Sequence, residues 1–228
     1  MTLHALHGFL GLPSDWTMFD TDVEKWDLIT EESLESASMT DWGVWFSNQD
    51  QVKEEDILLG YSMGGRLALH ALFQKPSHWK GAIFVSTHPG LTGEKERMER
   101  MHSDWALAKR FLTEEWDTLM EEWEAQELFR GVTLQRRESD YKRELLASSL
   151  FKWSLGLQQP FSHLLKQVDI PILWVVGEED HKFVEVSNHL EFSNPKSKVW
   201  VVKGAGHRLP WSHTESFKEQ VHQFMENL

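Results

Sequence analysis

The chain has 228 residues, a length that suits one globular domain and leaves little room for two. Hydrophobic residues make up 40% and charged residues 26%, which excludes a disordered or fibrous protein. No segment approaches the roughly 20 consecutive apolar residues of a membrane-spanning helix, and the N-terminal residues lack the features of a secretory signal. The absence of cysteine excludes disulfides, thiolate metal sites and thiol nucleophiles. Together these features predict a cytoplasmic protein.

The formal net charge is −13, which argues against nucleic acid and anionic membrane surfaces as partners. Residues 1–60 hold 2 basic and 13 acidic side chains and so carry −11 of that total. An anionic substrate would therefore have to be bound by basic groups from the later part of the chain. We predict no metal site, because the 12 histidines include no tight ligand pair on a predicted helix or hairpin. The sequence does not indicate an oligomeric state.

The first 90 residues alternate between apolar runs and segments with helical spacing. Four apolar runs are predicted as strands: 2–6, 26–29, 56–61 and 81–86. Three segments are predicted as helices: 16–19 with Ser14 or Asp15 as its cap, 41–49, and 64–75, which ends at Pro76.

Residues from about 92 to 166 have a different character, because segments rich in Glu, Lys and Arg with helical spacing replace the strands. We expect this stretch to be a helical cap inserted into a single domain that spans 1–228. After it, strands are predicted at 171–177 and 198–202, and helices at 184–192 and 215–228. Continuous apolar strands that alternate with helices predict an α/β fold, with a mainly parallel sheet covered by helices on both faces.

A serine motif lies between a predicted strand and a predicted helix. Residues 60–65 read Gly-Tyr-Ser-Met-Gly-Gly and match G-x-S-x-G. In a strand–turn–helix setting, such a motif forms a sharp turn that exposes the serine hydroxyl at the top of the sheet. The sequence therefore predicts Ser62 as a catalytic residue.

A serine hydroxyl needs a base, and that base needs an acid to fix its tautomer. In this type of fold the chain order is serine, acid, histidine. Asp180 follows one predicted strand, and His207 follows the next in a Gly-Ala-Gly-His turn. We predict these two residues as the acid and the base. Glu178 and Glu179 are the competing acids, although a solvated loop explains them more simply.

Negative charge that develops on a substrate oxygen requires hydrogen-bond donors that already point at it. In this type of fold, one donor is the backbone N–H of the residue after the nucleophile, which is Met63 here. The other comes from the loop after an early strand, and the His-Gly-Phe sequence at 7–9 indicates the N–H of Phe9. We expect His7 to hold this loop by hydrogen bonds.

With these motifs in order, the chain resembles the α/β-hydrolase superfamily over essentially its whole length. Members usually begin with an antiparallel hairpin before the His-Gly strand. Only six residues precede His7, so we expect this hairpin to be missing.

More particular motifs indicate one branch of the superfamily. Arg66 directly follows the elbow glycines, and His-Pro-Gly-Leu occupies 88–91. Further matching pieces are Glu96-Arg97, Arg100, Ser103-Asp104, Arg110-Phe111, Trp123 and residues 177–183. With them the chain resembles the 2-succinyl-6-hydroxy-2,4-cyclohexadiene-1-carboxylate synthases of menaquinone biosynthesis.

The resemblance implies a lyase rather than an ester hydrolase. In these enzymes the triad serine acts as a base that removes a ring proton, and pyruvate is expelled without an acyl-enzyme. No cofactor is implied. The substrate is a small molecule with several carboxylates, for which guanidinium groups are suitable partners. The positions that match the substrate-binding residues of the family are Tyr61, Arg66, Arg97 and Trp123.

The chain departs from the family pattern in the cap. A further substrate-binding arginine is usual in the second half of the cap, but residues 145–152 contain none. Arg143 and Lys152 are the candidates to replace it. Thr92 and Glu124 stand where the family commonly has a polar and an aromatic residue.

Two alternatives stay open at this point. Arg97 and Arg100 are flanked by glutamates, so a solvated helix face with ion pairs also explains them. A serine hydrolase, either a carboxylesterase or a thioesterase acting on a small ester with Ser62 acylated during turnover, is the alternative function.

Overall fold

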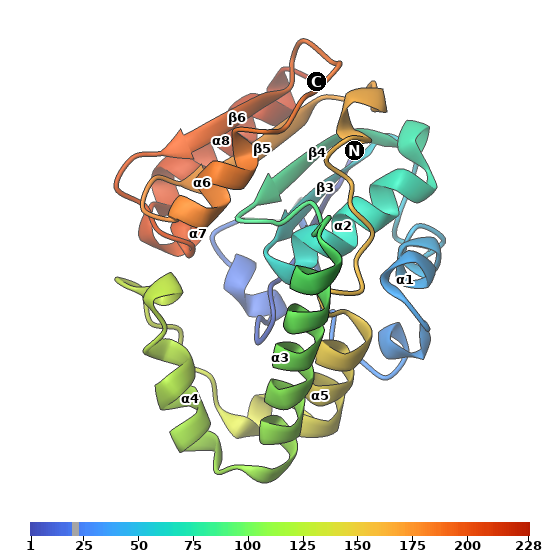
Figure 1. Ribbon diagram of the computed structural model, residues 1–228. Coiled ribbons are helices and arrows are strands. Elements are labelled where there is room, and N and C mark those ends of the chain that lie inside the picture. Colours follow the sequence, from blue (N-terminus) through green and yellow to red (C-terminus); the bar gives the residue numbers. More distant parts are fainter. Residues whose placement is uncertain (20–22) are drawn as a thin grey trace.

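The computed structural model describes residues 1–19 and 23–228 (Figure 1). Within these residues, six strands form one sheet in the order β2-β1-β3-β4-β5-β6, and every neighbouring pair is parallel. The strands are β1 (Leu3–Leu6), β2 (Val23–Trp26), β3 (Asp56–Tyr61), β4 (Trp79–Val85), β5 (Ile172–Gly177) and β6 (Lys198–Val202). The predicted mainly parallel sheet is confirmed.

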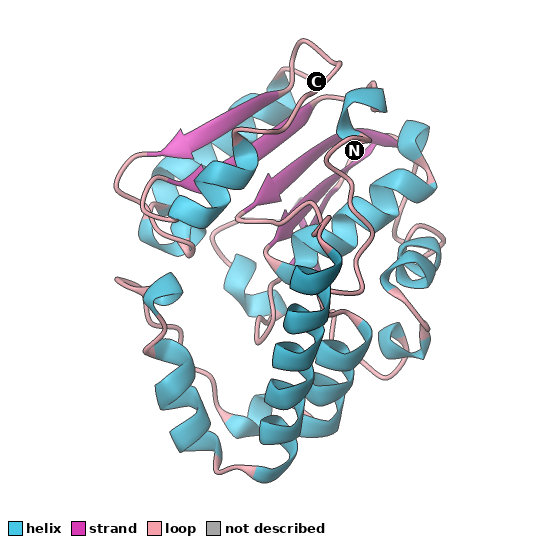
Figure 2. Ribbon diagram, in the orientation of Figure 1, coloured by secondary structure: helices cyan, strands magenta, loops and turns pink. Residues whose placement is uncertain are grey.

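Helices surround this sheet (Figure 2). The α-helices are α1 (Met39–Phe46), α2 (Met63–Gln74), α3 (Glu94–Thr113), α4 (Trp116–Glu124), α5 (Arg143–Lys152), α6 (His181–Ser187), α7 (Leu209–Ser212) and α8 (Thr214–Glu226). Short 3-10 helices are η1 (Pro13–Trp16), η2 (Ser33–Glu35), η3 (Pro76–His78), η4 (Glu127–Phe129), η5 (Glu138–Asp140) and η6 (Leu165–Gln167).

Alternate side chains of the strands enter two separate cores, because successive residues of a strand point to opposite faces of the sheet. In β5, Trp174 packs in the core that contains the apolar residues of α1 and α2, whereas Val175 packs in the core that contains those of α8. Both side chains are fully buried. Burial on both faces explains why the central strands β3, β4 and β5 read as nearly continuous apolar runs, and it confirms that helices cover both faces of the sheet.

Most predicted elements overlap the observed ones over more than half of their length. The strand predicted over 26–29 is wrong in its bounds, because β2 ends at Trp26. The next backbone amides bond to side chains instead of a strand: the N–H of Leu28 donates to Nε2 of His7 (3.0 Å) and that of Ile29 to Asp27 (3.1 Å).

Two predicted helices are also shifted. In place of a helix over 16–19, η1 begins at Pro13, whose missing N–H costs nothing at a helix start. Asp15 lies inside η1 and accepts the N–H of Leu12 (3.0 Å). In place of a helix over 184–192, α6 ends at Ser187, whose hydroxyl donates back to the carbonyl of Val184 (2.8 Å).

Residues between β4 and β5, all of which the structure describes, form helices and no strand. Figure 1 shows α3 and α5 side by side below the sheet, with α4 across from them on the same side of the sheet. These helices share a small apolar core that includes Phe111 of α3, Leu119 of α4 and Leu146 of α5, together with Leu10 from the loop after β1. The cap is therefore packed against a loop of the core.

The turn between β3 and α2 requires glycine at two positions. A Cβ atom on Gly64 would lie 2.3 Å from the carbonyl oxygen of Leu6 and 2.4 Å from that of His7, and one on Gly65 would lie 1.8 Å from Oγ1 of Thr87. The absence of side chains lets the start of α2 contact the end of β1 through Gly64 and the loop after β4 through Gly65.

We expect Gly64→Ala to lower the free energy of unfolding by about 2–3 kcal/mol, because the added methyl group meets backbone oxygens that cannot move aside. Urea denaturation measures the change. Gly93→Ala is the matched control, since its nearest contact would be 3.8 Å away at Glu96, and a change below about 0.5 kcal/mol is expected. Equal stability of Gly64→Ala and the unchanged protein would contradict the close approach of α2 and β1.

Candidate active site

Ser62 occupies the sharp turn between β3 and α2. Its φ of 52° and ψ of −112° place a residue with a side chain in a strained backbone conformation. The turn is held from both sides: the N–H of Ser62 donates to the carbonyl of Val85 (2.9 Å), and its carbonyl accepts the N–H of Arg66 (3.2 Å). The strained geometry leaves the hydroxyl facing the pocket.

The three residues predicted for a catalytic triad lie together. His207 Nε2 is 3.3 Å from Oγ of Ser62, and His207 Nδ1 is 2.6 Å from Oδ2 of Asp180. The imidazole and the carboxylate are both buried. An ionised carboxylate only accepts hydrogen bonds, so Nδ1 carries the proton and Nε2 is free to accept one from the hydroxyl. This arrangement suits proton transfer from Ser62.

The competing acids lie outside the site. Glu178 and Glu179 are exposed, and the Glu178 carboxylate accepts the N–H of Gly204 (2.8 Å), which orders the turn before the histidine. Of the three acidic residues after β5, Asp180 is the one that contacts His207.

A further contact that the sequence did not indicate holds the histidine. The Ser86 hydroxyl donates to the main-chain carbonyl of His207 (2.8 Å). Rings also pack on the imidazole, with centroid distances of 4.8 Å to Phe183, 5.5 Å to Tyr61 and 6.1 Å to Phe129. Two of these three rings come from the core and the third, Phe129, comes from the cap.

The two amides predicted to stabilise negative charge lie at the ends of neighbouring parallel strands, Phe9 after β1 and Met63 after β3. Within the described residues neither N–H donates to another protein group, so both are available to a ligand. Both residues also line the same pocket as Ser62. This position, where the strand order reverses, is the usual ligand site of an open parallel sheet.

His7 fixes the loop that carries Phe9. Its Nε2 accepts the N–H of Leu28 (3.0 Å), so its Nδ1 must be protonated and donates to the carbonyl of Gly8 (2.7 Å). The side chain is almost fully buried. The contacts therefore support the expected role of this histidine as a loop anchor.

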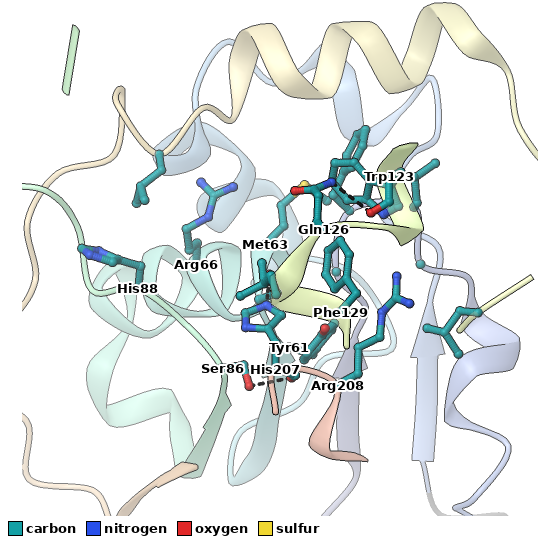
Figure 3. A pocket seen from close by; sticks show the side chains of 18 of the residues that line it. Tyr61, Met63, Arg66, Ser86, His88, Trp123, Gln126, Phe129, His207 and Arg208 are labelled. Carbon is teal, nitrogen blue, oxygen red and sulfur yellow. Dashed lines mark hydrogen bonds between the residues drawn. The ribbon is translucent and has the colours of Figure 1, made fainter. Parts of the chain in front are cut away.

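A cavity of about 380 Å³ lies between the core and the cap, in the range of small-molecule sites. Ser62 lines it from the core. Tyr61 and His207 also line it from the core, and Trp123 lines it from α4 of the cap (Figure 3). The Trp123 ring packs on Phe9, with centroids 5.4 Å apart. Burial, the main cause, raises the pKa of the Tyr61 hydroxyl, which therefore stays protonated.

One end of this cavity contains an unneutralised cation. Arg66 is 8% exposed, and its Nη1 donates to the carbonyl of Trp153 (2.7 Å) and contacts Sδ of Met39 (3.5 Å). No carboxylate of the described residues forms a salt bridge with it. Burial and then the charge of Arg100 lower the pKa of Arg66 to about 9, against the opposing effect of Asp104. A ligand carboxylate would relieve both the desolvation and the repulsion.

The two arginines of α3 have different positions. Arg97, predicted to bind substrate, does not line the cavity; its Nε donates to the carbonyl of Gly156 (2.8 Å). Arg100 does line the cavity, and its Nε lies 2.9 and 3.0 Å from the two carboxylate oxygens of Asp104. Since Asp104 is buried and also accepts the hydroxyl of Ser154 (2.7 Å), Arg100 is held in place.

His88 lies near three positively charged side chains at this end of the cavity. Its Nδ1 accepts the N–H of Gly90 (3.0 Å). Burial, followed by the charges of Lys182, Arg66 and Arg100, lowers the pKa of His88 to about 4. The imidazole is therefore neutral at pH 7 and is surrounded by cations.

We expect His88→Gln to flatten the pH dependence of stability between pH 6.5 and 4. In the unfolded chain this histidine takes up a proton near its ordinary pKa of 6.5, whereas the folded protein takes it up only near 4. The unfolded state therefore binds more protons in this window, and folded-state stability falls as the pH falls, by on the order of 3 kcal/mol at pH 4 from this residue.

Unfolding free energies measured across the window test the expectation. His189→Gln, at an exposed position, is the control, and an equal effect of both variants would contradict it.

The residues proposed to replace the missing cap arginine do not line the cavity. Arg143 donates to the carbonyl of Glu114 and to Glu138, and Lys152 donates to the carbonyl of Leu34. Their positive ends are therefore engaged elsewhere.

Two arginines that the sequence analysis did not consider line the other end of the cavity. Arg136 forms a two-bond ion pair with Asp15 (both 2.8 Å), and Arg208 forms one with Glu124 (2.5 and 2.7 Å). A signal for Arg208 was present, because it directly follows His207.

Within residues 1–19 and 23–228, no cluster of three or more His, Asp or Glu side chains is arranged to hold a metal ion. No helix in the described part of the chain combines the length and the apolar character needed to cross a membrane.

Comparisons with known proteins agree with this architecture. A family model described as the alpha/beta hydrolase fold matches residues 25–214. The 2-succinyl-6-hydroxy-2,4-cyclohexadiene-1-carboxylate synthase of Serratia proteamaculans is 26% identical over 97% of this chain and 92% of its own. The same enzyme of Salmonella arizonae is 33% identical over 66% of this chain and 60% of its own.

Solved structures show the same fold. The structure of MenH from S. aureus superposes with a TM-score of 0.85 at 23% identity and covers 100% of this chain and 94% of that one. A thermophilic esterase from Thermogutta terrifontis superposes with a TM-score of 0.70 at 16% identity, over 100% of this chain and 90% of that one.

The chain belongs to the α/β-hydrolase fold family, and it is an enzyme. The resemblance to the 2-succinyl-6-hydroxy-2,4-cyclohexadiene-1-carboxylate synthases, predicted from the motifs, is confirmed.

Proposed function

We propose that the protein is a lyase of menaquinone biosynthesis that eliminates pyruvate to form 2-succinyl-6-hydroxy-2,4-cyclohexadiene-1-carboxylate. The similarity to curated synthases over almost the full chain supports this function. The observation that carries it at the level of the site is the buried guanidinium of Arg66, which has no carboxylate partner among the described residues and lies in the same cavity as Ser62. The product of these synthases, as their name states, carries a ring carboxylate and a succinyl group. A substrate that carries the same groups would supply the anion that Arg66 lacks.

The proposed chemistry uses the triad as a proton relay. Ser62 passes its proton to Nε2 of His207 and removes a proton from the substrate ring, while Asp180 stabilises the imidazolium through Nδ1. The N–H groups of Phe9 and Met63 stabilise the enolate-like charge that results. The electrons of the broken C–H bond form a new ring double bond as the bond to the leaving group breaks, and pyruvate departs as its enolate. The imidazolium proton passes through Ser62 to this enolate, which gives pyruvate and returns the triad to its starting protonation state.

The substrate contacts that we propose are Tyr61, Arg66, Arg100 and Trp123, all of which line the cavity. For Arg97 we propose a supporting role at the Gly156 carbonyl instead of direct substrate contact. The ligand is a small carboxylate-bearing molecule, and no cofactor takes part.

We further propose that residues 1–228 act as one domain with 92–166 as its cap, and that the enzyme works in the cytoplasm. The shared packing of Leu10 with cap residues supports the first statement. The cysteine-free sequence is compatible with the second.

Pyruvate release from the menaquinone-pathway precursor, followed with a coupled lactate dehydrogenase assay, tests the function. A rate well above the non-enzymatic background is expected. A serine hydrolase is the second candidate, because the same triad and amides could support an acyl-enzyme. Background-level pyruvate release together with rapid turnover of small esters would establish that candidate and contradict the lyase.

A further inference from the structure

An ion pair joins the cap to the residue that follows the catalytic histidine. Arg208 donates to both carboxylate oxygens of Glu124, at the end of α4, and to the carbonyl of Val132 (2.8 Å). Both charged side chains are shielded from solvent, at 6% and 17% exposure. Charge-assisted, two-bond pairs of this kind fix orientation strongly, so the backbone next to His207 is tied to the cap.

One aromatic ring lies between this pair and the histidine. The Arg208 guanidinium lies 4.0 Å from the centroid of the Phe129 ring, a cation–π contact. The same ring packs on the imidazole of His207 at 6.1 Å. Phe129 belongs to η4 of the cap and is 8% exposed. Figure 3 shows Phe129 between His207 and Arg208 at the wall of the cavity.

The histidine depends on contacts of this kind. Asp180 binds Nδ1 of His207, and the Ser86 hydroxyl binds its main-chain carbonyl. The imidazole can still rotate about its hydrogen bond to Asp180, and packing of neighbouring rings limits that rotation. The Nε2–Oγ distance of 3.3 Å to Ser62 is already at the long end for such a hydrogen bond. A small rotation of the imidazole would therefore disconnect the base from the hydroxyl.

We propose that Arg208 and Glu124 are a positioning pair: they hold Phe129 against His207, and so align the imidazole with Ser62 when the cap is seated on the core. The proposal rests on the proposed catalytic role of the triad. The cap also contacts the loop after β1, which carries Phe9, because the Tyr141 hydroxyl donates to the carbonyl of Leu10 (2.8 Å). Alignment of the catalytic groups therefore depends on how the cap packs on the core.

The rate at which a fluorophosphonate labels Ser62 tests the proposal, since it reports activation of the hydroxyl without any assumption about the natural substrate. Arg208→Gln and Glu124→Gln are each expected to slow labelling by about ten-fold or more, as expected for a misaligned base. The double variant is expected to be no slower than the slower single variant, because both changes remove the same interaction. Arg208→Lys, which keeps the charge but not the two-bond geometry, is expected to restore part of the rate.

The control is Arg130→Gln in the same cap. Arg130 pairs with Glu127 at 2.9 Å, but the two side chains are 75% and 79% exposed, so an unchanged labelling rate is expected. If the Arg208 pair only anchored the cap, its loss would widen the entrance, and labelling would be equal or faster. That result, or additive losses in the double variant, would overturn the proposal.

Removing one member of a buried pair can also prevent folding. Phe129→Leu keeps the ion pair and removes the aromatic contact with His207, and it is expected to slow labelling to a similar extent while thermal unfolding shows a folded protein. A normal rate in folded Phe129→Leu would overturn the proposal. A failure of pyruvate release in the unchanged protein, with these labelling rates as expected, would reject the lyase function and leave the positioning pair intact.

Discussion

His207→Ala is expected to lower kcat for pyruvate release by about 10⁴-fold or more, the size of effect seen when a triad histidine is removed. His207 Nε2 is the group that lies within hydrogen-bonding distance of the Ser62 hydroxyl. Without it the hydroxyl has no base, whether it removes a substrate proton or attacks an ester. The loss should therefore appear with both types of substrate, measured in steady-state assays of the purified variant.

The identity of the acid can be decided in the same assays. Asp180→Asn is expected to cost a similar factor of about 10⁴, because an amide can stabilise the wrong tautomer of the imidazole. Glu179→Gln is the control, since that side chain is exposed, and its kcat should match the unchanged enzyme. A large loss in Glu179→Gln with a small one in Asp180→Asn would reverse the assignment.

The parts of this site that follow from local sequence were predictable. Glycine is required at Gly64 by the close approach of α2 to the end of β1, and at Gly65 by the contact with Thr87. The short G-x-S-x-G motif therefore reflects a local packing requirement. Asp180 lies shortly after the buried strand β5, and His207 lies shortly after the edge strand β6. Parallel strands bring their carboxyl ends to one edge of the sheet, so residues 145 positions apart in the chain meet there.

The parts that depend on contacts between distant side chains were not predictable. Arg97 and Arg100 lie on the same helix with similar neighbours, and the difference between them arises from the Gly156 carbonyl and the Asp104 carboxylate that capture them. In the same way, nothing near Arg208 in the sequence indicates its pairing with Glu124, 84 residues away. Helical spacing gives the face of a helix, but the partner is set by how the cap packs on the core.

The strand bounds show the same limit. Leu28 and Ile29 have apolar character suited to a strand, yet the N–H of Leu28 donates to the His7 ring. A side chain 21 residues away thus ended β2 earlier than its own sequence indicated.

Arg66→Gln is expected to lower kcat/KM for the carboxylate-bearing precursor by about 10²- to 10³-fold, the range for removing one partner of a buried charge contact. The reason is that the buried Arg66 guanidinium has no protein carboxylate of its own among the described residues, so the contact with substrate is not in competition with an internal ion pair. Turnover of a small neutral ester, if the enzyme supports any, should be nearly unchanged by the same substitution. Parallel kinetics with both substrates measure the difference.

Stability separates this effect from damage to the fold. An unpaired buried charge destabilises the folded protein, so Arg66→Gln should have a melting temperature equal to or above that of the unchanged enzyme while losing activity. Arg97→Gln is the matched control, since its guanidinium binds the Gly156 carbonyl and does not line the cavity; a loss below about three-fold is expected. Equal kcat/KM for Arg66→Gln and the unchanged enzyme would contradict the proposal that Arg66 binds a substrate carboxylate. A larger loss in Arg97→Gln than in Arg66→Gln would instead indicate that Arg97 binds the substrate, as the sequence predicted.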